Sequence, residues 1–111
     1  MPLAYRPQTS AAEPLTSIQR VMLRDLLDAM WREHVVDITN LAVRFHENET
    51  PEVAAELAAV RRRLVDVESA MDRMDARTYG HCDACERLIA FEHLEARPSR
   101  RYCLQCQPPT R

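Results

Sequence analysis

The sequence predicts a mainly α protein: an antiparallel helical hairpin (coiled coil) with a small C-terminal four-cysteine zinc-finger module. Two long stretches carry apolar residues three and four positions apart, which is the spacing of amphipathic helices. Gly80 is the only glycine among 111 residues, and this argues against a many-turned β fold. All four cysteines follow that glycine. The length suits a single domain.

The chain divides into four predicted segments. Residues 1–15 contain three prolines among polar residues, so we expect a disordered N-terminal tail. Residues 16–79 form the hairpin, with its tip near 47–52. Residues 80–107 form the zinc-finger module, which lacks helical periodicity, and residues 108–111 form a C-terminal tail.

The first helix is predicted to begin at a capping box, in which Thr16 is followed three residues later by Gln19. It should run to about Phe45 or His46. Its apolar stripe contains Leu23, Leu27, Trp31, Val35, Ile38, Leu41 and Phe45.

The second helix is predicted to begin at Thr50 and Pro51, a good N-cap followed by proline at the first helical position. Its stripe alternates steps of four and three residues, the pattern of a coiled-coil seam: Val53, Leu57, Val60, Leu64, Val67, Met71 and Met74. A connection this short makes the two helices antiparallel neighbours.

In an antiparallel pair, facing positions have a constant sum. Five apolar pairs share the sum 98: Phe45–Val53, Leu41–Leu57, Ile38–Val60, Trp31–Val67 and Leu27–Met71. The same register places His34 opposite Leu64. We therefore expect Val35 to turn inward there and His34 to lie at the edge of the seam.

Two C-x2-C pairs predict one structural zinc ion. Cys82 and Cys85 form the first pair, Cys103 and Cys106 the second, with 17 residues between them. Four thiolates satisfy the tetrahedral preference of zinc and leave no open position for catalysis. Redox chemistry is the alternative, but no βαβ pattern surrounds either pair. His81 and His93 are nearby but are not needed as ligands.

Charge and hydropathy exclude some classes. The net charge is −2, no apolar run is long enough to cross a membrane, and the first residues lack a signal-peptide stretch, so we expect a cytoplasmic protein. The finger's spacing resembles GATA-type DNA-binding fingers, which makes DNA binding the alternative function. Residues 80–111 carry five arginines and four acidic residues, and a zinc tetrathiolate brings the module to −1. That charge does not favour duplex binding.

The turn between the helices is acidic. Four carboxylates and no arginine lie between His46 and Glu56. Acids near a helix start complement its dipole, which is one interpretation. The other is a charged tip held away from the zinc module for contact with another molecule.

The finger resembles the DksA/TraR family in three motifs: Tyr79-Gly80-His81-Cys82-Asp83-Ala84-Cys85, Leu94-Glu95-Ala96-Arg97-Pro98 and Cys103-Leu104-Gln105-Cys106-Gln107. The resemblance implies a non-enzymatic regulator that binds bacterial RNA polymerase and inserts its coiled-coil tip through the secondary channel to modulate initiation. It also implies that direct DNA binding is not needed. Residues 49–54 follow the family's Asp-x-x-Asp-x-Ala tip motif with Glu for Asp, so the implied effector residues are Glu49, Glu52 and Ala54.

This sequence departs from the family at several positions. Glu86 stands where a glycine is usual, and His93 where an arginine is usual. Arg97 matches one basic position of the guanosine tetraphosphate site found in some members, and is a candidate polymerase or nucleotide contact. The other two positions are Asp66 and Gln107, so we expect a weak or absent response to that nucleotide.

Overall fold

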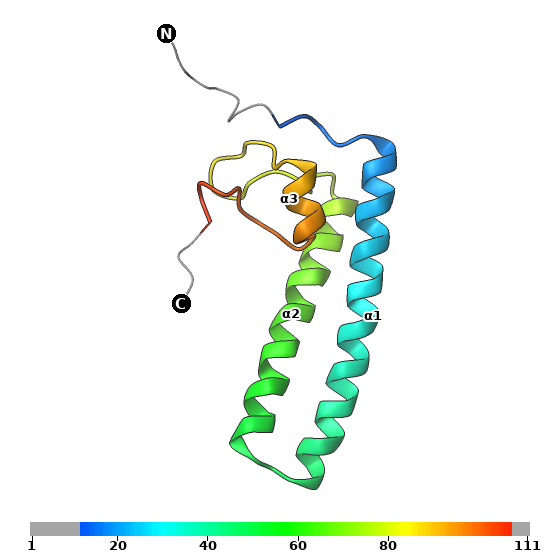
Figure 1. Ribbon diagram of the computed structural model, residues 1–111, viewed down its shortest axis with the longest axis vertical. Helices are drawn as coiled ribbons and strands as arrows, with labels where there is room; N and C mark the ends of the chain where they lie inside the picture. Colours follow the sequence, from blue (N-terminus) through cyan, green and yellow to red (C-terminus); the bar gives the residue numbers. More distant parts are fainter. Residues whose placement is uncertain (1–11, 108–111) are drawn as a thin grey trace.

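The structure, a computed structural model, describes residues 12–107, and it contains three helices there (Figure 1). Helix α1 spans Ser17–Glu47, α2 spans Pro51–Asp75 and the short α3 spans Phe91–Ala96. The expected tails at 1–11 and 108–111 lie outside the described residues. Helices α1 and α2 run antiparallel, and the finger sits at the end opposite their connecting turn. No described helix is long and apolar enough to span a membrane.

The helix ends follow the predicted signals. The Thr16 hydroxyl accepts a hydrogen bond from the Gln19 amide and the Gln19 side chain accepts one from the Thr16 amide, both at 3.0 Å. At α2, the Thr50 hydroxyl accepts from the Val53 amide at 3.2 Å. The end of α2 is closed by Arg77 in the left-handed region (φ 66°), and the Thr78 amide donates to the Arg73 carbonyl at 2.8 Å. This is a Schellman arrangement with arginine in the usual glycine position.

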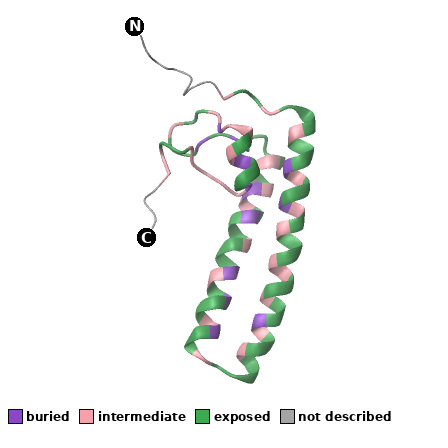
Figure 2. Ribbon diagram, viewed as in Figure 1, coloured by how far each residue is buried: buried purple, intermediate pink, exposed green. Residues whose placement is uncertain are grey.

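Buried residues lie on the facing sides of α1 and α2 (Figure 2), and they form two separate clusters. The cluster near the turn holds both members of three predicted pairs: Leu41, Val53, Leu57 and Val60, with Ile38 and Phe45 packed against them. The cluster at the zinc end joins Leu23, Leu27, Val67 and Ala70 to four residues of the finger region: Tyr79, Cys82, Ile89 and Leu94.

The prediction for Trp31 is wrong. Its side chain is 37% exposed, and its indole N–H donates to the Glu68 carboxylate at 3.0 Å. Met30 packs against the zinc-end cluster instead. A buried indole N–H needs a partner, and at the seam edge it has one, while the flexible Met30 fills the space inside.

The seam is interrupted at its centre. His34, Val35 and Leu64 are half-buried, and none of them belongs to either cluster. The predicted inward turn of Val35 therefore does not bury it. The Nδ1 atom of His34 is buried and has no hydrogen-bond partner among the described residues. An imidazole opposite Leu64 cannot continue the apolar packing, which accounts for two cores where the pattern predicted one seam.

Two parts of the zinc end differ from the prediction. Helix α3 was not expected, yet its Leu94 is fully buried in the zinc-end cluster. Leu15 was assigned to the tail, yet it packs against the same cluster and lies 3.5 Å from where a Cβ at Gly80 would stand. Gly80 has φ 93°, a conformation that favours glycine. The sole glycine thus sits where the chain leaves the hairpin.

Candidate metal centre and helical tip

The structure brings the four predicted cysteines together. The sulfur atoms of Cys82, Cys85, Cys103 and Cys106 all lie within 4.8 Å of one another, and those of Cys85 and Cys103 are 3.8 Å apart. A tetrahedral zinc with bonds of about 2.3 Å requires sulfur separations of about 3.8 Å. The donor set and its spacing therefore fit one zinc ion. Neither His81 nor His93 belongs to the cluster.

Backbone turns aim the first pair of sulfurs. The Ala84 amide donates to the Cys82 sulfur at 3.4 Å, and the Glu86 amide donates to the Cys82 carbonyl at 2.9 Å. Glu86 adopts φ 66°, in the left-handed region. Glycine adopts this region freely and a side chain adds strain. This conformation gives a physical reason why glycine is usual at the position of Glu86 in the DksA/TraR family, which the finger resembles.

The surroundings of Cys82 favour its thiolate. Burial raises the pKa of this thiol, but backbone N–H groups of Cys103, Cys85 and Ala84 outweigh that effect and lower it to about 6. The pKa of Cys106 is raised to about 12, chiefly because its thiol hydrogen-bonds with the sulfurs of Cys103 and Cys85. Crowded thiolates repel one another. A dication at their centre removes that repulsion, which is the stabilisation a structural zinc supplies.

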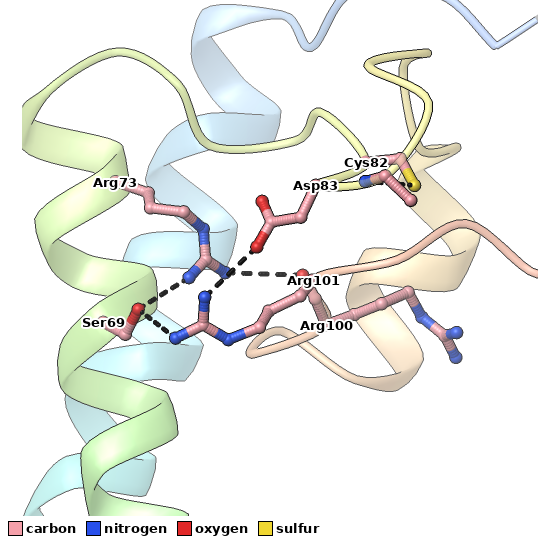
Figure 3. Close-up of polar contacts among 7 residues, drawn as sticks. Ser69, Arg73, Cys82, Asp83, Arg100 and Arg101 are labelled. Atoms are coloured by element: carbon pink, nitrogen blue, oxygen red, sulfur yellow. Dashed lines mark hydrogen bonds and ion pairs between the residues drawn. The ribbon is translucent and has the colours of Figure 1, made fainter. Parts of the chain in front are cut away.

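A polar joint, formed by Ser69, Arg73, Asp83 and Arg101, ties the finger to α2 (Figure 3). The Ser69 hydroxyl accepts from Arg73 at 2.8 Å and from Arg101 at 2.6 Å. Arg101 also donates to the Asp83 carboxylate at 3.2 Å. Burial and the nearby charge of Arg101 lower the pKa of Arg73. The joint fixes how the finger is oriented on the arm.

Tyr79 adds a second, apolar attachment. Its side chain is buried, and its hydroxyl donates to the Pro98 carbonyl at 2.8 Å. Burial raises the pKa of Tyr79 to about 12, so the neutral phenol persists. This hydrogen bond holds the segment after α3 against the start of the finger.

The three positions compared with a nucleotide site do come together. Arg97, Asp66 and Gln107 line one hollow of about 140 Å³, with Ser99 and three further residues. Arg97 is exposed, and Gln107 accepts a hydrogen bond from Arg100 at 2.7 Å. Arg100 and Arg101 also line this hollow, so Asp66 is outnumbered by three guanidinium groups. Two of them are already engaged, because Arg100 donates to Gln107 and Arg101 donates to Ser69 and Asp83.

The tip presents its acids to solvent. Glu49 and Glu52 are exposed, and neither forms an ion pair within residues 12–107. Glu56 lies 4.0 Å from Arg44, but both side chains are 58% exposed. Ala54 is half-buried. Glu52 lies in the first turn of α2, where it complements the helix dipole, but Glu49 precedes the helix and the capping interpretation does not account for it.

The joint was missed by sequence reasoning. Ser69 and Arg101 are 32 positions apart, and no local pattern connects them. The available signal was two residues of opposite charge near the cysteines, Asp83 directly after Cys82 and Arg101 two residues before Cys103.

Three comparisons with known proteins agree. Residues 77–110 match the Prokaryotic dksA/traR C4-type zinc finger family. The RNA polymerase-binding transcription factor DksA of Haemophilus influenzae is 25% identical over an alignment of 111 positions, which spans 86% of this chain and 76% of that protein. The structure of transcription factor DksA2 from Pseudomonas aeruginosa matches with a TM-score of 0.75 and 20% identity, covering 88% of this chain and 89% of that one.

Proposed function

Because this chain belongs to the DksA/TraR family, we propose that it is a transcription regulator that binds bacterial RNA polymerase and inserts its acidic tip through the secondary channel to modulate initiation. In this proposal the finger, with its single structural zinc, holds the base of the arm. Glu49, Glu52 and Ala54 are the effector residues at the tip. The protein acts in the cytoplasm and needs no enzymatic activity.

The observation that carries the proposal is the placement of the tip. The turn that bears Glu49 and Glu52 lies at the opposite end of the hairpin from the finger (Figure 1). Helix α2 has 25 residues, so the arm is about 38 Å long. An arm of this kind can carry two exposed carboxylates into a narrow channel while its base remains outside.

The alternative, a zinc-finger DNA-binding protein, is less well supported. Arg100 and Arg101 would be the phosphate contacts, but both are engaged within the molecule. Arg100 donates to the Gln107 side chain at 2.7 Å, and Arg101 donates to Ser69 and Asp83. Phosphate binding would have to break these contacts, and the module carries little positive charge to compensate.

Arg97 remains a candidate contact with the polymerase. Its side chain is exposed beside the joint, close to the base of the arm. We expect guanosine tetraphosphate to change the activity weakly or not at all, since Asp66 and Gln107 are not basic.

The proposal is tested by co-purification with core RNA polymerase and by transcription from defined promoters. The variant Glu49→Ala/Glu52→Ala should keep polymerase binding within a few-fold and lose most of the transcriptional effect, because its backbone and core are unchanged. Asp72→Ala removes an exposed carboxylate near the base and is the matched control. Absence of polymerase binding at micromolar concentration would overturn the proposal. Loss of polymerase binding in the tip variant would mean that the tip contributes to binding affinity and not to the transcriptional effect alone.

A further inference from the structure

Helix α1 is apolar on two faces. Its seam face buries Leu23, Leu27 and Leu41. A second line, here called the outer stripe, contains residues seven positions apart: Met22, Ala29, Val36 and Val43. Seven residues make almost two turns, so these side chains lie in one row. Val36 is nine residues from Leu27, which places it about half a turn around the helix from the seam.

The outer stripe is open to solvent. Met22, Val36 and Val43 are 43%, 57% and 53% exposed, and Ile18, Val21 and Leu26 widen the row at its start. The exposed outer side of α1 can be followed along its length in Figure 2. On α2, Val65 is the only large hydrophobic residue with this degree of exposure. Single exposed apolar residues are ordinary, but here they recur at every seventh position along one line of α1, with Asp25, Arg32 and Asn40 between them.

The charged residues beside the outer stripe indicate which partner fits it. If two α1 helices pair antiparallel about a two-fold axis, facing positions have a constant sum. With the sum 65, Met22 faces Val43 and Ala29 faces Val36. Arg32 then faces Glu33 of the second copy, and the two-fold axis makes this ion pair twice. Both side chains are exposed, and neither is in an ion pair within the described residues.

The same register brings one pair of like charges to the same level, Asp28 and Asp37. Each is one residue away from the row, a rotation of about 100° around the helix, so these carboxylates point away from the contact. Arg24 of the same chain also lies 3.5 Å from Asp28 and offsets its charge. The pair therefore opposes association only slightly.

Other ways of pairing oppose like charges nearer the row. A shift of one heptad gives the sum 58, which places Asp25 against Glu33, or the sum 72, which places Asp25 against Glu47. Parallel pairing places Arg32 of one copy against Arg32 of the other. Like charges held opposite each other destabilise helix pairs. Among these arrangements only the antiparallel one with sum 65 combines apolar contacts with opposite charges beside the row.

We propose that the outer stripe is a self-association surface, on which a second copy of this chain docks antiparallel around two Arg32–Glu33 pairs. The surface is isologous, as a two-fold dimer requires. The row is narrow, so the dimer is weak, with a Kd on the order of 10–100 µM. The tip of each copy lies beside the start of α1 of the other, and the paired arm is twice as thick as a single one. Dimer formation does not depend on the proposed function, but it would compete with insertion into a channel.

The test is sedimentation of the zinc-loaded full chain from micromolar to millimolar concentration. Arg32→Glu sets two carboxylates against each other across the dimer, and Glu33→Arg sets two guanidinium groups together. Each variant should therefore weaken self-association about tenfold or more. An equimolar mixture of the two variants restores both opposite-charge pairs and should associate like the original chain. The double variant Arg32→Glu/Glu33→Arg should also recover.

Arg62→Glu is the control, because it makes the same charge change on the exposed side of α2 and should leave association unchanged. Circular dichroism checks that helix content is retained in every variant. A chain that stays monomeric to millimolar concentration overturns the proposal. So does an association constant that the single variants do not change, or a mixture that fails to recover.

Discussion

The two ends of the hairpin are stabilised by different means. At the zinc end, α1, α2 and the finger share one buried cluster, and the polar joint and four clustered cysteines add to it. At the tip, a cluster of four buried residues and one capping hydroxyl hold the turn. The proposed working residues, Glu49 and Glu52, belong to the end with fewer constraints. Stability is thus concentrated away from the acids, which stay exposed for a partner.

Zinc removal should produce the largest difference in stability between the two ends of the hairpin. Zinc binding supplies roughly 10–16 kcal/mol to a structural four-thiolate site, so its loss should unfold residues 80–107. Native-state hydrogen exchange should show protection lost there and at the adjoining helix turns, while the cluster at Leu41 and Leu57 keeps much of its protection. Cys103→Ser should act like chelation, and Leu104→Ser, at an exposed neighbouring site, should not. Full protection throughout the finger without metal would contradict a structural role.

A matched pair of cavity variants measures the same difference in packing. Leu94 has no exposed surface and Leu57 is 7% exposed. We expect Leu94→Ala to lower the free energy of unfolding by about 4 kcal/mol and Leu57→Ala by about 2–3 kcal/mol, because the cavity at the two-helix tip collapses more readily. Urea unfolding of the zinc-loaded chain measures both. Equal losses, or the larger loss at Leu57, would mean that the tip is packed as firmly as the base.

Loss of the tip cap should have a smaller and local effect. Thr50→Ala removes the hydroxyl that accepts from the Val53 amide, and we expect a loss of about 1 kcal/mol. Amide exchange should quicken in the first turn of α2, while zinc affinity stays unchanged. Thr39→Ala is the control, because that hydroxyl bonds to the Val35 carbonyl inside α1 and caps nothing. A change in zinc affinity in the Thr50 variant would show that the two ends are coupled.

The hairpin and the cysteine cluster could be predicted because each follows from spacing alone. A helix start depends on Thr16 and Gln19, three residues apart, and a zinc knuckle on two cysteines with two residues between them. Each of these signals is local. Tertiary contacts such as the bond between Ser69 and Arg101 have no local signal. Helix α3 has six residues, too few for a periodicity to be recognised.

Trp31 shows a different limit. The position of Trp31 matched the apolar spacing of the seam. Spacing alone does not show that the indole N–H needs a hydrogen-bond acceptor, and Glu68 provides one at the edge of the seam. At the tip, the sequence alone allowed both a capping role and a functional role for the acids. The structure shows that Glu49 and Glu52 are exposed and form no ion pair within the described residues. Their role still rests on the family resemblance, so the tip variant is the experiment that tests it.

Strain at the zinc end offers the smallest effect, and its sign is opposite. Glu86 holds φ 66°, and glycine adopts this conformation without the Cβ penalty. We expect Glu86→Gly to raise the free energy of unfolding by about 0.5–1 kcal/mol. Glu92→Gly, in the first turn of α3, is the matched control and should lower it by a similar amount, because glycine is unfavourable in a helix. If both variants lose stability, contacts of the Glu86 side chain stabilise the finger by more than its strained backbone destabilises it.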